Sequence, residues 1–337
     1  MRTASGVSIS KLFLKRSLQI QDLFVKDIKK YSTSLATREF EDIQISVPWG
    51  HIAGKWYGPK NTRPIVGLHG WQDNAGTYDT LAPLLPTHLG FLSIDLPGHG
   101  LSSQLPEGCT YHSIDYVNTL FTIMREFKWN KISMICHSMS AINGFIFTSL
   151  FPDKCDMYVA LDNLKPVLRT KPEHTIKTIT ERFAGHTKQI EFALKDTKPP
   201  CYEYEEIVER LYKGTSKSIS KECCKFILQR NMKPSEEEPN KYYFSRDGRL
   251  KSMMFFLFPH EVVVEMAQRI KCPHLFIKAL NAPKYDMKAD YEEVLNTLKQ
   301  NPLFEHHIVS GTHHVHLNEP QKIADIVNPF INKYRPV

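Results

Sequence analysis

The residue on which chemistry could centre is Ser138, which follows a short apolar run that ends at Cys136 and is separated from it by His137. Apolar residues at helical spacing begin at Met139, so the stretch predicts a strand, a tight turn and a helix with one hydroxyl at the apex. Such a turn exposes the serine Oγ and aims the next backbone N–H toward a developing oxyanion. The G-x-S-x-G pattern has glycine where this chain has Cys136 and Ser140. A serine in an ordinary strand-to-helix turn is the alternative explanation of this stretch taken alone.

The C-terminal part of the chain is rich in histidine, which raises the question of a metal site. The residues concerned are His306, His307, His313, His314 and His316. Consecutive residues of a strand point to opposite faces, and no helix carries the H-x-x-x-H spacing of a zinc site. We therefore expect neither a metal nor a cofactor.

The elements that must position Ser138 alternate between apolar strands and helix-length segments. The strand runs are too continuous for a half-exposed sheet, and the spacing is that of strand–helix units. Both features predict an α/β fold whose mostly parallel central sheet is covered by helices on both faces, with an antiparallel pair at its edge. Strands are expected at 42–47, 51–58, 64–70, 91–96, 131–136, 156–161, 273–279 and 305–311, and helices at 78–85, 111–127, 139–150, 291–299 and from 320 toward 330.

The alternation stops between residues 165 and 270. Helical spacing persists there from Ile176 to Leu194, further helices are expected at 204–212 and 220–229, and a turn or hairpin at 242–250. We expect a mostly helical lid at 165–270, inserted between the two parts of the core at 40–164 and 271–337. Residues 1–39 form an N-terminal extension.

Composition excludes several classes of protein. Of 337 residues, 42% are hydrophobic and 23% are charged, which is ordinary for a globular chain. The net charge of +7 is spread over lysines interleaved with acidic residues, so we expect no nucleic-acid partner. No run of about 18 apolar residues exists, so no transmembrane segment is expected. The sequence leaves the oligomeric state open.

The cysteines and the N-terminus bear on location. The seven cysteines have no metal-type spacing, and no Asn-x-Ser/Thr acceptor occurs, so we expect a reducing, intracellular location. Residues 1–21 carry Arg2, Lys11, Lys15 and Arg16 and no acidic residue. This pattern is typical of a mitochondrial targeting segment. The alternative is a disordered or docking N-terminal helix of a cytoplasmic or peroxisomal protein.

Five short motifs occur in order along the chain: Val47–Ala53, His69–Asn74, Asp95–Ser103, Arg246–Leu250 and Gly311–His316. On these motifs the chain from residue 40 onward resembles the α/β-hydrolases, and among them the serine hydrolase-like (kraken-type) branch. The resemblance implies acyl transfer by a serine, an acid and a histidine in that chain order.

The resemblance assigns Ser138 as the nucleophile and His313 as its base, with His314 and His316 as alternatives. A serine hydroxyl is a poor nucleophile near neutral pH, so a base is required. For the acid we favour Asp162, because a strand end holds a side chain more rigidly than a loop does. Asp286 is the alternative acid.

The family pattern also assigns supporting roles. The backbone N–H groups of Met139 and Trp71 are the expected oxyanion donors. Asp95 and His99 are expected to hold a turn by hydrogen bonding.

The leading hypothesis for function is a carboxylesterase- or thioesterase-type serine hydrolase acting on a small or medium acyl substrate. Aromatic residues of the insert would supply an apolar pocket: Tyr242, Tyr243, Phe244, Phe255, Phe256 and Phe258. Haloalkane dehalogenation and epoxide opening are disfavoured, because on this scaffold both need a carboxylate in place of Ser138. The alternative is a catalytically inactive α/β-hydrolase that acts as a small-molecule binding or regulatory module. Two features favour it: the turn glycines are missing, and residues 280–283, where many relatives carry the acid after a strand, contain no carboxylate.

Overall fold

A computed structural model describes residues 38–166, 172–195, 198–284 and 286–337. They belong to one unit of the chain, Arg38–Val337. The predicted targeting segment, and the N-terminal extension up to residue 37, lie outside the described residues. Among the residues described, no helix has the length and apolar character needed to cross a membrane.

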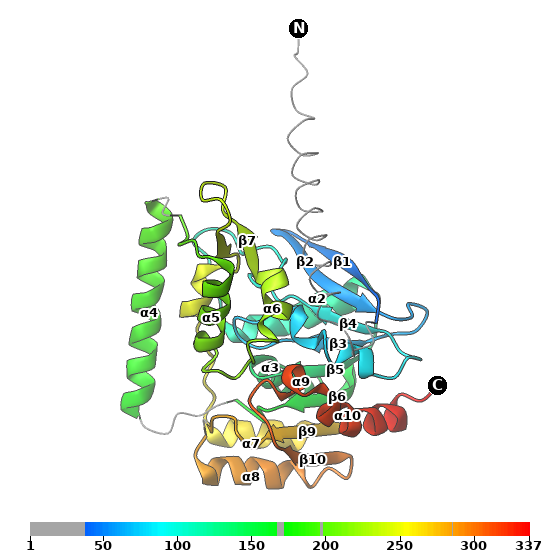
Figure 1. Ribbon diagram of the computed structural model, residues 1–337. Helices are drawn as coiled ribbons and strands as arrows, with labels where there is room; N and C mark the ends of the chain where they lie inside the picture. The colour runs from blue at the N-terminus through cyan, green and yellow to red at the C-terminus, as the bar shows by residue number, and fades with distance from the viewer. Residues whose placement is uncertain (1–37, 167–171, 196–197, 285) are drawn as a thin grey trace. The chain divides into compact units, whose positions relative to one another are not determined.

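An eight-stranded sheet forms the centre of this unit, in the order β1-β2-β4-β3-β5-β6-β9-β10 (Figure 1). The predicted antiparallel edge pair is confirmed: β1 pairs with β2, and β2 runs antiparallel to β4. All other neighbours are parallel. The strands are β1 (Phe40–Val47), β2 (Gly50–Tyr57), β3 (Ile65–Leu68), β4 (Phe91–Ile94), β5 (Ile132–His137), β6 (Cys155–Leu161), β9 (His274–Ala279) and β10 (Phe304–Val309).

Two apolar clusters, one on each face, bury the sheet beneath helices. The first cluster joins the sheet to α2 (Tyr116–Glu126), α3 (Met139–Leu150), α7 (His260–Arg269) and α8 (Lys288–Leu298). The second joins it to α10 (Pro320–Tyr334) and to the segment that holds the short 3₁₀ helices η1 (Ala75–Tyr78) and η2 (Ala82–Leu84). Further short helices are η3 (Ser113–Asp115), η4 (Pro152–Lys154) and α9 (Val315–Asn318).

The prediction of a helix at 78–85 is wrong: η1 ends at Tyr78, and the rest of this range contains a turn and the 3₁₀ helix η2. Pro83 lies in the first turn of η2 and has no N–H to continue a helical ladder. The side chain of Asn74 caps η1 by accepting from the N–H of Gly76.

The insert between β6 and α7 contains α4 (Pro172–Leu194), α5 (Tyr204–Gly214), α6 (Cys224–Asn231), the strand pair β7 (Met232–Pro234) and β8 (Tyr242–Phe244), and η5 (Gly248–Ser252). Helices α5 and α6 share a small core of their own, which includes Ile207, Leu211 and Ile227. Helix α7 falls within the range predicted for the lid, yet its Val263 and Met266 lie in the main core against α3 and α8. The core therefore resumes near residue 260, because the apolar face of α7 is needed to cover the sheet.

Candidate active site

Ser138 stands at the sharp turn between β5 and α3. Its backbone has φ 55° and ψ −115°, a conformation that residues other than glycine rarely adopt. Parallel pairing of β5 with β6 holds the turn, since the N–H of Ser138 donates to the Leu161 carbonyl at 3.0 Å. The strand, turn and helix predicted around Ser138 are thus confirmed.

The residues that replace the turn glycines fit without displacing the helix. Cys136 and Ser140 are fully buried. The Ser140 hydroxyl donates to the His69 carbonyl, which ties the start of α3 to the turn after β3. Close approach of helix and strand is supplied by Gly144, where a Cβ would lie 3.2 Å from Cys136 Sγ and 2.6 Å from the Tyr158 ring. The glycine that allows α3 to approach the sheet closely therefore lies one helical turn after Ser140.

The structure brings Ser138, His313 and Asp162 together. Ser138 Oγ lies 2.7 Å from His313 Nε2, and His313 Nδ1 is hydrogen-bonded to Asp162 Oδ2. Since Nδ1–H donates to the carboxylate, Nε2 is the acceptor for the serine hydroxyl. The other two histidines considered for this position have different partners: His314 Nδ1 lies 2.8 Å from Ser218 Oγ, and His316 Nε2 lies 2.8 Å from Thr77 Oγ1.

Asp162 follows β6, has φ 70° and is 2% exposed. Its second oxygen, Oδ1, accepts from Lys278 Nζ at 2.8 Å and from the Ala279 N–H at 3.0 Å. Burial by itself would raise the pKa of Asp162, but the hydrogen bond from His313 and the charge of Lys278 lower it below the ordinary value. Lys278 was not predicted, because its place beside Asp162 follows only from the pairing of β6 with β9.

The alternative acid, Asp286, contacts a different group. Its Oδ1 lies 2.7 Å from Nζ of Lys165, a lysine with no exposed surface. The carboxylate that bonds His313 Nδ1 is that of Asp162. A buried ammonium requires a counter-charge, and the pair with Lys165 gives Asp286 a structural role.

The turn after β3 passes close to Ser138. A Cβ at Gly70 would lie 3.2 Å from Ser138 Cβ, so a side chain here would fit only if its neighbours shifted by a few tenths of an ångström. Trp71 follows, and its indole N–H donates to the Leu250 carbonyl at 2.7 Å. Met139 is the first residue of α3, so its N–H has no acceptor within the helix. Ser138, Met139 and Trp71 line the same cavity.

The predicted loop-holding roles of Asp95 and His99 are confirmed. Asp95 accepts from the N–H of Ala75 at 2.7 Å and from the N–H of Leu101 at 2.9 Å, and it pairs with the buried Arg230. His99 Nε2 accepts from the N–H of Gln72 at 3.2 Å. Burial lowers the pKa of His99 well below its ordinary value, so the ring remains a neutral acceptor near pH 7.

The motif at 246–250 joins the insert to the core. Arg246 Nε donates to Gln72 Oε1 at 3.1 Å, beside Trp71. Asp247 accepts from the Tyr111 hydroxyl at 2.8 Å, and Arg249 donates to the carbonyls of Leu105, Pro106 and Cys109. This part of the insert therefore holds the turn that faces Ser138.

The cavity beside Ser138 has a volume of about 260 Å³ and mostly apolar walls. Its lining includes Ile142 and Ile146 of α3, Ile179 of α4, and Phe255 and Phe256. Of the other aromatic residues predicted to form the pocket, Tyr242 and Phe244 pack with α5 and α6, and Phe258 packs on the main core.

Comparison with known proteins agrees with this architecture. Residues 63–188 match the family described as the alpha/beta hydrolase fold. The chain is 32% identical over 307 residues to a probable serine hydrolase of Drosophila melanogaster, covering 89% of this chain and 90% of the relative. It is 31% identical to a serine hydrolase-like protein of Mus musculus, covering 86% of this chain and 95% of the relative.

Among solved structures, a hypothetical protein from Pseudomonas aeruginosa PAO1 is similar, with a TM-score of 0.71 and 27% identity. The match covers 86% of this chain and 99% of that chain. These matches confirm the resemblance on which the sequence prediction depended. The chain belongs to the α/β-hydrolase family, in the branch of the serine hydrolase-like proteins.

Proposed function

We propose that the protein is a serine hydrolase of the carboxylesterase or thioesterase type, with Ser138 as nucleophile, His313 as base and Asp162 as the acid. The observation that carries the proposal is the 2.7 Å contact of Ser138 Oγ with His313 Nε2. It is supported by the hydrogen bond of His313 Nδ1 with Asp162. A nucleophile, a base and a group that orients the base are the minimum set for acyl transfer.

The first half of the reaction forms an acyl-enzyme. Ser138 Oγ attacks the acyl carbon while its proton passes to His313 Nε2. Asp162 stabilises the imidazolium that results, and the imidazolium then gives the proton to the departing alcohol or thiol. In the second half, His313 takes a proton from water, the hydroxide attacks the acyl carbon, and Ser138 regains its proton as the acid product leaves.

The tetrahedral intermediates carry a negative oxygen that needs hydrogen-bond donors. The N–H groups of Met139 and Trp71 are our candidates, because both residues line the cavity with Ser138. A single such donor contributes roughly 10²–10³ in rate. The hydrogen bonds from Trp71 and Gln72 to other parts of the chain hold this turn in place before the substrate arrives.

The cavity favours an apolar acyl group. Its walls are mainly side chains of Ile142, Ile146, Ile179, Met254 and Phe255, which bind hydrocarbon better than polar chains. The volume of about 260 Å³ favours a short or medium acyl chain.

The proposal is tested by labelling the purified protein with a fluorophosphonate probe and by screening p-nitrophenyl esters and acyl-CoA thioesters. We expect labelling and turnover that Ser138→Ala and His313→Ala both abolish. Ser310→Ala is the control, because Ser310 is exposed, bonds Lys322 and is not among the residues that line the cavity, so this variant should label normally. A protein that shows neither labelling nor turnover between pH about 6 and about 9, where a histidine base becomes neutral, would contradict the proposal and favour an inactive binding module.

A further inference from the structure

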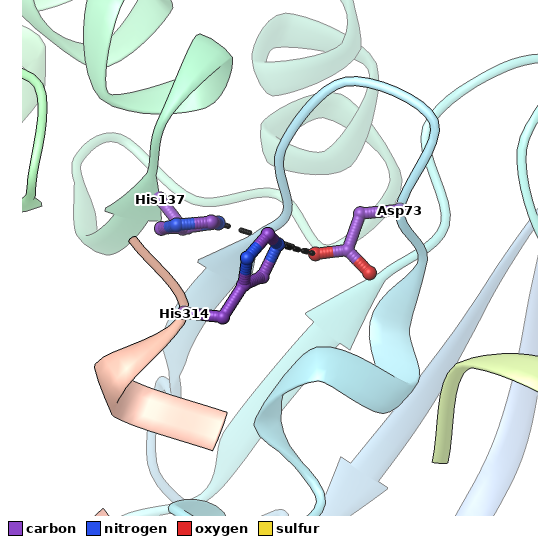
Figure 2. A group of neighbouring side chains, drawn as sticks. All are labelled: Asp73, His137 and His314. Carbon is purple, nitrogen blue, oxygen red and sulfur yellow. Dashed lines mark ion pairs between the residues drawn. The ribbon is translucent and has the colours of Figure 1, made fainter. Parts of the chain in front are cut away.

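A second group of polar side chains lies next to the candidate active site, with the His137 ring 4.6 Å from the His313 ring, centroid to centroid. Asp73 from the turn after β3, His137 at the end of β5 and His314 before α9 point toward one another (Figure 2). Asp73 Oδ2 lies 4.0 Å from His137 Nδ1 and 3.8 Å from His314 Nε2. The three atoms lie within 4.8 Å of one another, and all three residues are buried. None of them has a role in the proposed acyl transfer.

The hydrogen bonds around the group leave acceptor atoms facing one another. His137 Nε2 lies 2.9 Å from the His313 carbonyl, and a carbonyl only accepts, so Nε2 carries the proton and Nδ1 presents a lone pair. Asp73 Oδ1 accepts from the Asn74 N–H at 2.9 Å. Asp73 Oδ2 and His137 Nδ1 are both buried without a hydrogen-bond partner. Two acceptors at 4.0 Å are too far apart to share one proton.

The third residue completes the pattern. His314 Nδ1 lies 2.8 Å from Ser218 Oγ, so a proton on Nδ1 can be donated to Ser218 and Nε2 is then a lone pair aimed at Asp73. Ordered second partners of this kind, a carbonyl for His137 and a hydroxyl for His314, are what metal-bound histidines use to fix their tautomer. Gly70 leaves room at this point, since a Cβ there would lie 3.1 Å from His137 Nδ1.

We propose that Asp73, His137 and His314 form a binding site for a divalent transition-metal ion of the zinc type. Two imidazoles and one carboxylate are a common ligand set for Zn²⁺, with ligand distances of about 2.0–2.2 Å and a fourth position left for water. In tetrahedral geometry these distances place ligand atoms about 3.4 Å apart. Binding therefore shortens the two distances to Asp73, 4.0 and 3.8 Å, by roughly half an ångström, and shortens the separation of the two histidine nitrogens, which is within 4.8 Å, by at most about 1.4 Å.

Protonation favours binding near and above neutral pH. Burial lowers the pKa values of His137 and His314 well below their ordinary value, so both rings are neutral, as metal ligation requires. Burial raises the pKa of Asp73 to about 7. A proton therefore competes with the metal at Asp73, and binding at neutral pH releases a fraction of one proton.

A metal ion at this site would inhibit the proposed hydrolase, and this consequence depends on the proposed function. The His137 ring lies 4.6 Å from the His313 ring, centroid to centroid, and donates to the His313 carbonyl. A dication next to His313 disfavours the imidazolium that must form when Ser138 attacks. We therefore expect bound Zn²⁺ to lower kcat and to have less effect on KM.

The experiment measures Zn²⁺ binding calorimetrically on the chelator-treated full chain, with reduced cysteines, for the wild type and for Asp73→Asn and His314→Gln. We expect one site in the wild type and a loss of affinity of at least about 100-fold in both variants. His307→Gln is the matched control, because His307 is exposed beside Glu305 on β10 and its loss should change nothing at this site. Thermal unfolding checks that each variant is folded.

Co²⁺ provides a second measurement. We expect visible absorption of tetrahedral cobalt without the sulfur-to-metal charge-transfer band that a cysteine ligand would add. Absence of stoichiometric binding in the wild type, a thiolate band, or binding that both site variants retain would overturn the proposal. Binding by Ser138→Ala separates the two hypotheses: it should match the wild type even if the hydrolase proposal fails. Binding to wild type without inhibition of an active enzyme would overturn the inhibitory role alone.

Discussion

Two buried carboxylates, Asp162 and Asp73, lie near adjacent histidines but differ in their hydrogen bonding. Asp162 accepts from His313, Lys278 and Ala279, and these partners lower its pKa. Asp73 has one oxygen without a partner, and burial raises its pKa to about 7. Residues adjacent in sequence supply both groups: Ser138 and His313 belong to the group with Asp162, and His137 and His314 to the group with Asp73. A fully bonded carboxylate suits the holding of a histidine in one orientation, whereas an incompletely bonded one suits capture of a proton or a cation.

The largest effect is expected from removing the carboxylate charge of Asp162. In Asp162→Asn the amide cannot hold His313 in the tautomer that accepts from Ser138, so we expect kcat to fall by about 10⁴ with the fold retained. Steady-state kinetics on the best ester of the screen measures it. Asp286→Asn is the control. It should lower thermal stability, because buried Lys165 loses its counter-charge, but its kcat should stay within about tenfold of the wild-type value. Equal losses of kcat in the two variants would contradict the assignment of the acid.

The next effect concerns stability in acid. Burial lowers the pKa of His69 to about 4 and those of His274 and His316 to about 3. Below pH about 6.5 the unfolded chain binds protons that the folded chain does not, so stability falls as the pH falls toward 4. Each histidine contributes up to about 1.4 kcal/mol per pH unit. Urea unfolding at several pH values measures the decline, and a stability that is constant between these limits would refute it.

Asp73 acts in the opposite direction. Its pKa is raised in the folded state, so between pH about 7 and about 4 the folded chain holds a proton that the unfolded chain lacks, and stability gains as the pH falls. Asp73→Asn removes the proton-binding group and with it this gain in stability. We expect the variant to be more stable than the wild type at pH 8, and its decline in acid to be steeper by about 1.4 kcal/mol per pH unit. Identical pH dependence in metal-free buffer would show that Asp73 is not perturbed.

The smallest effect is expected from removing the charge of Lys278 beside Asp162. Lys278→Met removes one charged donor from Asp162 and leaves the bonds from His313 and Ala279. Its charge lowers the pKa of Asp162, so its loss raises that pKa and moves the acid limb of the kcat/KM profile to higher pH. We expect a fall of about tenfold near neutral pH, since a hydrogen bond to a charged group contributes about 1.5 to 3 kcal/mol. An unchanged acid limb would assign Lys278 to packing only.

The pattern of apolar residues along the sequence predicted the parts of the fold that depend on residues close together in the chain. The turn at Ser138 and most strands follow from apolar runs and the hydrogen-bonding demands of the backbone. The prediction was weaker where a partner comes from a distant segment. Lys278 reaches Asp162 because β9 pairs with β6 across the whole insert, and no periodicity within either strand indicates that pairing.

The grouping of Asp73 with two histidines was missed for the same reason. In the sequence the late histidines are neighbours of one another, and as alternating residues of a strand they would point to opposite faces. The structure instead pairs His314 with side chains from two other strand ends. Arg230 was also missed, since its partners Asp42 and Asp95 lie in β1 and after β4. A buried ion pair between remote segments leaves no local signal in a single sequence.

The hydrogen bond from the Trp71 indole to the Leu250 carbonyl connects one part of the insert to the turn next to Ser138. Different parts of the insert should therefore tolerate substitution to different degrees. Residues 246–250 support the turn next to Ser138, so substitutions there would disturb the reacting centre in every substrate context. Helix α4 contributes Ile179 to the cavity and exposes Ile176 and Phe183, but its Arg182 lies 4.9 Å from the centre of the Trp71 ring. Exposed positions of α4 can therefore change at little risk to that centre, whereas Arg182 cannot. A change of cavity shape that spares the turn next to Ser138 is therefore expected from substitution of Ile179, not from substitution of Arg182 or of residues 246–250.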